Sequence, residues 1–154
     1  MIKYDYKEAK DFSESEIILF KKILINAGEV SEDSFKSLID KNPKIIILGN
    51  KENIDGIGAL KIPNKKYKEK VFALSNSKKD SSEYNFELGW LVSLKSGSGN
   101  KIVELLTSLE KNIYATVREK NEKMIHLLKK YGFQKTGFSF KSNRGNYQIL
   151  LFTK

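Results

Sequence analysis

A strand, a helix and a second strand follow one another without interruption near the C-terminal end of the chain, and this stretch constrains the fold most tightly. The apolar run at residues 113–117 predicts the first strand. Asn121 is placed to cap a helix with apolar residues at helical spacing, and Gly132 is placed to end it. Phe133 then opens the next strand. Upstream, a loop with two glycines, residues 95–101, opens another helix.

The same two periodicities organise the rest of the chain. Apolar spacing predicts helices from Ser13 or Ser15 to about Gly28 and over residues 31–41. Residues 64–80 fit either a short helix or an ordered loop, and residues 75–82 a solvated linker. Strands are predicted over the following ranges: 2–6, 44–50, 54–62, 84–92, 113–117, 133–140 and 147–153. The expectation is one α/β (α+β) domain over residues 1–154, with about seven mostly antiparallel strands and about four helices.

Composition excludes several kinds of chemistry. The chain has 154 residues and no cysteine, which rules out a disulfide framework, a thiol nucleophile and a thiolate metal site. It has a single histidine, His126, so we predict no metal site. Neither a membrane-spanning apolar run nor an apolar signal core is visible, so we expect a cytoplasmic protein that does not bind membranes.

The charge leaves one alternative open. The formal net charge is +9, which suits nucleic acid, an acidic partner or a polyphosphate cofactor. However, the basic residues are almost all lysines scattered along the chain, whereas sequence-specific DNA recognition favours arginine. A solvated surface is the simpler interpretation, and nucleic-acid binding is the less favoured one.

Two local motifs, together with the order of elements, resemble the GNAT superfamily of acyl-CoA-dependent N-acyltransferases. The first is Leu94-Lys-Ser-Gly97-Ser-Gly99, which is similar to the family's Gln/Arg-x-x-Gly-x-Gly/Ala loop. In that family the loop amides hold the CoA pyrophosphate at a helix N-terminus, where unsatisfied N–H groups and the positive end of the helix favour phosphate oxygens. Leu94 departs from the usual Gln or Arg, and Lys95 or Lys101 could supply the missing charge. Taken alone, a Gly-x-Gly is also an ordinary flexible turn.

The second motif is the ungapped stretch from Asn121 to Phe133, which resembles the family helix Asn-x-x-Ala-x-x-Leu-Tyr-x-x-x-Gly-Phe. The resemblance places Asn121 near the pantetheine arm, although an N-cap explains this residue equally well. Leu128 stands where the family often has a tyrosine that protonates the departing thiolate, and leucine cannot donate a proton. Another donor, water, or binding without efficient transfer would account for it.

The resemblance implies acetyl-CoA as cosubstrate and an amine-bearing acceptor that attacks it directly in a ternary complex. The thioester would lie in a splay between the strand ending at Val92 and the strand at residues 113–117. Backbone amides around residues 91–93 would stabilise the oxyanion. The implied cofactor-binding residues are Leu91, Val92, Ser93, Lys95, Ser96, Gly97, Ser98, Gly99, Asn100, Lys101 and Asn121.

Glu87 is the candidate catalytic residue, since a carboxylate on the strand before the loop could take a proton from an ammonium substrate. A solvent-facing strand position would explain it equally well. His126 flanks the apolar stripe of its helix and fits an exposed role better than a catalytic one. A non-catalytic CoA-binding or regulatory domain remains the alternative to an N-acetyltransferase. The acceptor, the acyl-chain preference and the oligomeric state, a homodimer included, stay open.

Overall fold

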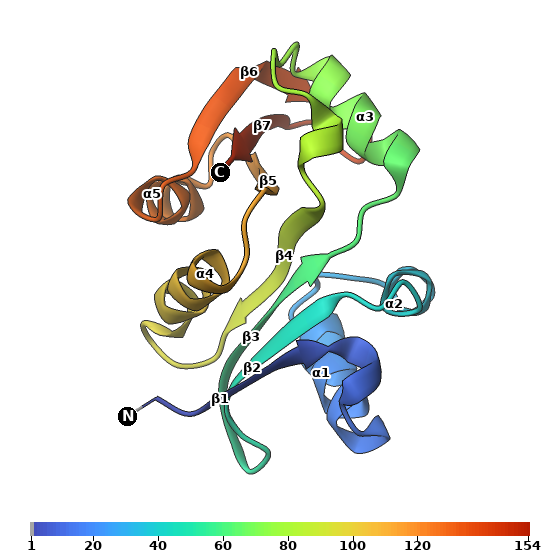
Figure 1. The fold of residues 1–154 in the computed structure, drawn as a ribbon, viewed down its shortest axis with the longest axis vertical. Coiled ribbons are helices and arrows are strands. Elements are labelled where there is room, and N and C mark those ends of the chain that lie inside the picture. Colours follow the sequence, from blue (N-terminus) through green and yellow to red (C-terminus); the bar gives the residue numbers. More distant parts are fainter. Residues whose placement is uncertain (1) are drawn as a thin grey trace. The chain divides into compact units, whose positions relative to one another are not determined.

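The computed structural model describes residues 2–154, in which seven strands are joined in one sheet and five α-helices lie between them along the chain (Figure 1). The strands are β1 (Tyr4–Glu8), β2 (Lys44–Asn50), β3 (Asn53–Lys61), β4 (Phe86–Ser93), β5 (Ile113–Arg118), β6 (Gln134–Lys141) and β7 (Gln148–Thr153). The α-helices are α1 (Glu14–Asn26), α2 (Glu32–Ile39), α3 (Lys65–Leu74), α4 (Ser98–Leu109) and α5 (Glu122–Lys130). Two short 3₁₀ helices, Ala9–Asp11 and Ser81–Glu83, precede α1 and β4.

The strand order in the sheet is β1-β2-β3-β4-β5-β7-β6. The pairs β1–β2, β2–β3, β5–β7 and β6–β7 are antiparallel. Strands β4 and β5 run parallel, with Phe86 opposite Ile113 and Glu87 opposite Tyr114. The expected mixed α/β fold with a mostly antiparallel sheet is therefore confirmed. Helix α3 makes the number of α-helices five in the described chain, where the sequence predicted about four.

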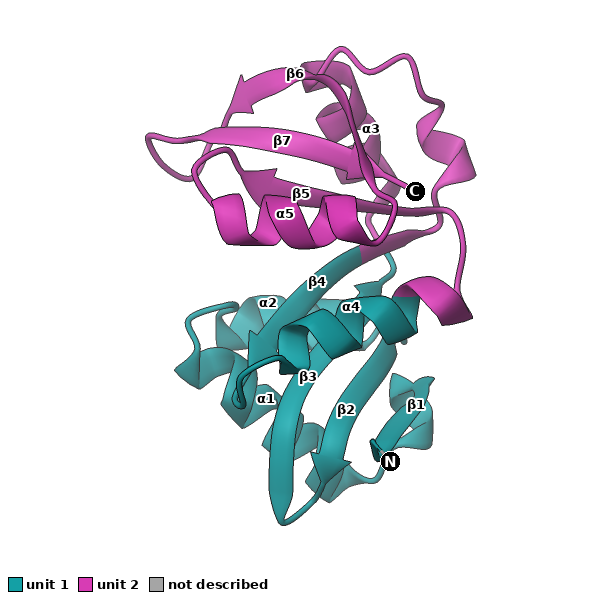
Figure 2. Ribbon diagram, turned by 90° about the vertical axis from the view of Figure 1, so that its left-hand side faces the viewer, with its two compact units in different colours: residues 1–62, 88–106 teal, residues 63–87, 107–154 magenta. Residues whose placement is uncertain are grey.

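The chain divides into two compact units (Figure 2). Unit 1 contains the residues up to Ile62 together with Leu88–Leu106, and unit 2 contains Pro63–Glu87 and Thr107–Lys154. The division falls inside β4, between Glu87 and Leu88. Each unit therefore has its own core, and the two cores differ in kind.

Unit 1 packs α1 and α2 on one face of its strands and α4 on the other (Figure 2). The α1–α2 face holds an aromatic group in which the ring centroids of Phe35 and Trp90 lie 5.4 Å apart and those of Phe20 and Trp90 5.9 Å apart. Ile45, Ile47 and other apolar strand residues complete this cluster, and Phe20 is fully buried. Side-chain alternation along β2 places these isoleucines on one face of the strand, as the period of two requires.

Local capping and turn chemistry explain where the unit 1 elements begin. Ser13 caps α1 in a complete capping box with Glu16. Between β2 and β3, the Asn50 side-chain oxygen accepts hydrogen bonds from the amides of Glu52 and Asn53. This closes the hairpin that the polar link predicted.

Unit 2 packs α3 and α5 on opposite faces of β5, β7 and β6 (Figure 2). The core under α3 is a small cluster of Val71, Phe72, Tyr84, Tyr114 and Leu151. The Phe72 ring stacks on Tyr84 and meets Tyr114 edge-on, each at 5.5 Å between centroids. Apolar and polar residues alternate along β5, so this strand contributes side chains to the packing on both faces of the unit 2 sheet.

Helix α3 is capped by Asn64 at its start and anchored to β6 at its end. The Phe138 amide donates to the Ser75 carbonyl at 2.7 Å. At the same place Gly137 has φ +71°, and a Cβ there would collide with the Ser75 carbonyl oxygen. Only glycine fits such a position without strain. Of the segment 64–80 that the sequence left as helix or loop, Lys65–Leu74 is therefore an ordered helix fixed at both ends, and a turn follows it.

Candidate functional site

The glycine-containing loop is held in shape from within unit 1. The amides of Leu94 and Lys95 both donate to the Asp55 carbonyl, at 2.9 and 3.0 Å. The Ser93 and Ser98 hydroxyls lie 2.7 Å apart, which ties the end of β4 to the first residue of α4. These hydrogen bonds therefore hold the loop and the N-terminus of α4 in one conformation.

Glycines on the neighbouring strand β3 and in the loop itself allow this arrangement. On β3, a Cβ at Gly56 would lie 2.9 Å from the Ser98 hydroxyl, and one at Gly58 would lie 2.8 Å from Ile102. These two glycines let the first turn of α4 approach the sheet backbone. Gly97 has φ +85°, and the space around it is open to a distance of 4 Å. Gly99 is buried, yet a Cβ there would meet only the Ser93 Cβ, at 3.7 Å.

The first turn of α4 contains amides with no acceptor inside the helix, which is the property an anion site requires. The Ser98 amide donates a hydrogen bond to the Lys95 carbonyl, at 3.0 Å. Lys101 forms an ion pair with Glu104 at 2.7 Å, so its charge is already shared. Lys95 and Ser96 are exposed, Asn100 is half-buried, and Leu94, at the Gln/Arg position of the motif, is 55% exposed.

Backbone strain occurs at Trp90 on β4, directly before the predicted oxyanion residues. Trp90 has φ +54°, a left-handed conformation that bulky residues rarely adopt. Such strain costs on the order of 1–3 kcal/mol and persists only where the surroundings enforce it. The buried Trp90 ring, packed between Phe20 and Phe35, supplies that enforcement. After it, Leu91 is half-buried, Val92 is buried and Ser93 is exposed.

In unit 2, Asn121 is an exposed N-cap, and its side-chain oxygen accepts from the Met124 amide at 3.1 Å. Leu128 is fully buried, so the core, rather than an open ligand surface, accounts for this leucine. A tyrosine at position 128 would overfill that core. His126 is exposed, as expected.

Glu87 is a buried carboxylate rather than a surface group. It is 6% exposed and accepts a hydrogen bond from the Tyr67 hydroxyl at 3.3 Å. Tyr67 itself is 43% exposed, but its hydroxyl turns inward from α3. Desolvation at that hydroxyl, followed by the negative charge of Glu87, raises the pKa of Tyr67. The solvent-facing alternative for Glu87 is therefore wrong.

Tyr114 stands opposite Glu87 on β5 and is fully buried. Its hydroxyl has no hydrogen-bond partner within the described chain. Burial, followed by the charges of Glu87 and Tyr67, raises the pKa of Tyr114 well above its ordinary value. An unpartnered buried hydroxyl next to a carboxylate is costly, and it marks a place where water or a ligand atom can be bound.

Sequence reasoning missed Tyr67 and Tyr114 as parts of this polar cluster. The sequence did contain one signal, since Asn64 as a cap with Tyr67 and Val71 at helical spacing indicates a helix with one inward face. The lysines between these residues masked that pattern. Nothing local in the sequence links position 67 to position 87.

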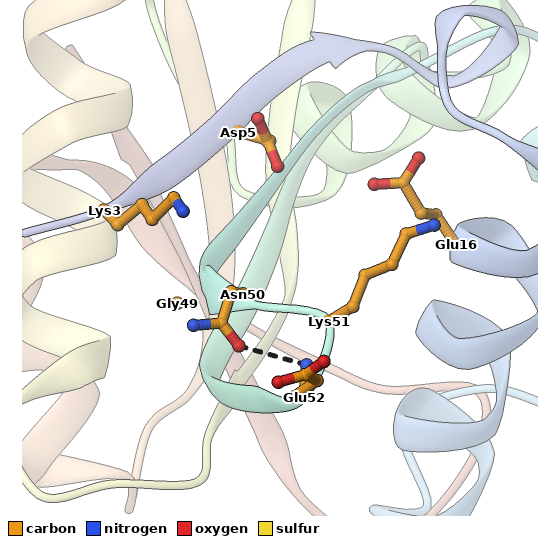
Figure 3. A pocket seen from close by; sticks show the side chains of 7 residues that line it. All are labelled: Lys3, Asp5, Glu16, Gly49, Asn50, Lys51 and Glu52. Atoms are coloured by element: carbon orange, nitrogen blue, oxygen red, sulfur yellow. Dashed lines mark hydrogen bonds between the residues drawn. The ribbon is translucent and has the colours of Figure 1, made fainter.

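A separate pocket of about 410 Å³ lies in unit 1 at the β2–β3 turn (Figure 3). Its lining residues are Lys3, Asp5, Glu16, Gly49, Asn50, Lys51 and Glu52. Asn50 and Glu16 are already used in the turn and in the α1 cap. None of the predicted site residues lines this pocket.

Two features of residues 2–154 bear on metal and membrane binding, the grouping of metal-binding side chains and the length and apolarity of the helices. No group of three or more His, Asp or Glu side chains within residues 2–154 is arranged to hold a metal ion. Among the helices described there, none is long and apolar enough to cross a membrane.

Solved structures of other proteins share the fold of this chain, whereas sequence comparisons find no match. No protein-family model matches the sequence, and no curated protein matches it. Solved structures do match along the whole chain. An acyl-CoA N-acyltransferase from Pseudomonas aeruginosa has a TM-score of 0.69 at 11% identity, covering 100% of this chain and 99% of that one.

Two further structures agree. Arabidopsis thaliana NAA60 in complex with acetyl-CoA has a TM-score of 0.67 at 13% identity, covering 99% of both chains. The ribosomal-protein-S18-alanine N-acetyltransferase from Escherichia coli has a TM-score of 0.65 at 12% identity, covering 98% of this chain and 92% of that one. The protein therefore has the fold of the GNAT superfamily, as the two sequence motifs predicted.

Proposed function

We propose that this protein is an N-acetyltransferase that moves the acetyl group of acetyl-CoA to a primary amine. The single observation that carries the proposal is the buried carboxylate of Glu87, kept on β4 of a GNAT fold. An NAA60 structure with this fold contains acetyl-CoA. Because fold alone does not determine chemistry, the proposal depends on the roles of individual residues.

The roles follow from the environments of the residues. Residues 95–101 and Asn121 bind the cosubstrate, and the first-turn amides of α4 receive its phosphate oxygens. Backbone amides at residues 91–93, which follow the strained Trp90, stabilise the oxyanion that forms as the amine attacks. The new N–C bond replaces the C–S bond, the nitrogen proton passes to Glu87 directly or through water, and the thiolate leaves.

The protonation of that thiolate does not use position 128, because Leu128 has no proton to give. We assign this step to water or to another donor. We treat residues 1–154 as one functional module in a cytoplasmic protein.

The direct test is acetyl-CoA consumption, measured as thiol release against a panel of amines. Glu87→Gln keeps the shape of the side chain and removes the base, so we expect kcat/KM to fall by roughly 10²-fold. Glu83→Gln is the matched control, since Glu83 is an exposed acid in the same unit. An undiminished rate in Glu87→Gln across the pH profile would remove Glu87 from the mechanism.

Cosubstrate binding is tested separately with Gly99→Val. A Cβ at Gly99 would meet only the Ser93 Cβ, at an ordinary contact distance of 3.7 Å, so we expect the variant to fold. Its side chain would instead obstruct a pyrophosphate approaching the α4 amides, and CoA affinity should fall. Calorimetric titration with CoA measures the effect, with the melting temperature as folding control. A folded variant with unchanged affinity would contradict the proposal.

Two further measurements distinguish the proposed enzyme from the alternative functions. Thermal stabilisation by CoA without turnover of any amine would favour a CoA-binding regulatory domain. A salt-dependent shift with DNA or RNA would favour nucleic-acid binding.

A further inference from the structure

Only two of the chain's 28 basic residues are arginines, and both act on one tyrosine in unit 2. Arg118 ends β5, and its guanidinium carbon lies 3.9 Å from the centroid of the Tyr147 ring. Arg144 lies in the connection between β6 and β7. A hydrogen bond with Ser142, and then the charges of both arginines, lower the pKa of Tyr147. A chain that uses lysine almost everywhere else thus gathers its two planar cations at one place.

The segment that carries Arg144 is fixed rather than loose. Ser142 is buried, and its amide donates to the Tyr147 carbonyl at 3.0 Å. The Ser142 hydroxyl accepts from the Arg144 amide at 3.0 Å. Within residues 2–154 neither Arg118 nor Arg144 forms an ion pair with a carboxylate. Both arginines are exposed, and Arg144 lies on the short connection that leads into Tyr147, the residue whose ring the Arg118 guanidinium covers.

Arg118 lies on the same face of the unit 2 sheet as Glu87. Alternate residues of a strand share a face, so Arg118 lies on the side of Tyr114, whose partner on β4 is Glu87. Helix α3 covers this face, and its Tyr67 links the two ends of the cluster. The Tyr67 hydroxyl donates to Glu87, and the positive charge of Arg144 acts on the same hydroxyl.

We propose that Arg118 and Arg144 bind a carboxylate group of the acceptor, so that the substrate class is an amine whose carboxylate lies well away from its nitrogen, such as a long ω-amino acid. Arg118 is four residues along β5 from Tyr114, about 13 Å, so the adjacent charged groups of an α-amino acid would not reach both ends. A guanidinium pairs with both carboxylate oxygens at once, which a lysine ammonium cannot do. The inference rests on the proposed function, which assigns Glu87 to the ammonium end of the acceptor. Asn121, which is assigned to CoA, caps helix α5 on the opposite face of the unit 2 sheet (Figure 2).

The first test does not depend on catalysis. With only two arginines, the protein gives two Arg Nε–Hε signals in a ¹⁵N NMR spectrum, and Arg144→Lys identifies one of them. We expect N-acetyl-L-leucine to shift both signals saturably and its neutral analogue N-acetyl-L-leucinamide to shift neither. Equal shifts with acid and amide, or none with the acid, would overturn the proposal. Shifts of the same kind with CoA alone would assign the site to a cofactor phosphate and would also overturn it.

The second test uses turnover of ω-amino acids, such as 6-aminohexanoate, and of the matching amides. For the acids we expect Arg144→Gln to lower kcat/KM by about 10- to 100-fold, mostly through KM, and for the amides to change it little. Lys135→Gln removes the same charge from β6 at a position paired with Phe152, on the other face, and should affect neither series. An equal loss for acids and amides would contradict the assignment. Absence of turnover with these two series and with every member of the amine panel would disprove the proposed function, and the NMR result would then decide on the carboxylate site alone.

Discussion

The two units of this protein bury different kinds of side chains. Unit 1 packs Phe20, Phe35 and Trp90 among aliphatic strand residues in a wholly apolar cluster. Unit 2 has a smaller apolar cluster and, beside it, the Glu87 carboxylate and the unpartnered Tyr114 hydroxyl. Hydrophobic burial stabilises the first kind of core, whereas the second carries desolvated polar groups at a cost.

The purely apolar packing and the buried polar side chains are therefore found in different units of the chain. Unit 1 also contains strain, at Trp90, but surrounds it with rings that enforce the conformation. Unit 2 leaves a hydroxyl unsatisfied, which packing does not explain. Sites where a fold departs from local consistency are where function is expected.

Trp90→Ala tests the apolar side of the comparison and should have the largest effect. Removing a buried tryptophan costs about 3–5 kcal/mol, a large part of the stability of a typical domain. Urea unfolding followed by circular dichroism measures the loss. Leu109→Ala, at a position 42% exposed on α4, is the control and should change the free energy of unfolding little. A loss below about 1 kcal/mol for Trp90→Ala would mean that the aromatic cluster does not stabilise unit 1.

Two glycines with the same backbone conformation compare the units directly. Gly28 in unit 1 has φ +73° in open space, and Gly137 in unit 2 has φ +71° against the Ser75 carbonyl. Gly28→Ala should cost about 1–2 kcal/mol from conformation alone. Gly137→Ala adds a steric conflict and should cost about 1–3 kcal/mol more. Equal losses in urea unfolding would show that α3 is not anchored tightly to β6.

Tyr114→Phe tests the polar side and should stabilise the protein. The variant removes a buried hydroxyl without a partner, and the cost of such a group is about 1–3 kcal/mol. If an atom of the bound acceptor uses that hydroxyl, activity should fall even as the melting temperature rises. A destabilised variant would show that the hydroxyl already has a partner in solution.

The same variant should change the response to alkaline pH. Burial raises the pKa of Tyr114 and Tyr67 in the folded state, so their neutral forms favour folding. Their contribution to stability is complete below pH 10, the ordinary tyrosine value, and is lost as the pH rises through the raised pKa. Unfolding at pH 9 and pH 11 should show a smaller drop in Tyr114→Phe than in the native protein.

Sequence patterns predicted most of the fold because the signals were local. Ser13 and the link at Asn50 act through bonds to residues two or three positions away. The ordered α3 was only half predicted, because its inward face depends on contacts with β5 and β6 that lie far along the chain. The left-handed Trp90 has no local signal at all, since it is imposed by the packing of its ring.

The candidate site was predictable only in part, for the same reason. The two glycines of the loop and the N-cap at Asn121 are readable as motifs. Glu87 could be named from its place on a strand, but its burial and its bond to Tyr67 join residues 20 positions apart. The gathering of Arg118 and Arg144 on Tyr147 depends on strand pairing and cannot be read from their spacing.

The insertion of β7 between β5 and β6 has a consequence for folding on the ribosome. Strand β6 leaves the ribosome before β7, but in the sheet it pairs only with β7 within the described chain. Until β7 has emerged, β5 and β6 both present an unpaired strand edge, the kind of surface that invites aggregation. Strands β1, β2 and β3, in contrast, are sheet neighbours in the order of their synthesis. Nascent chains stalled before residue 148 should therefore be the ones that chaperones protect.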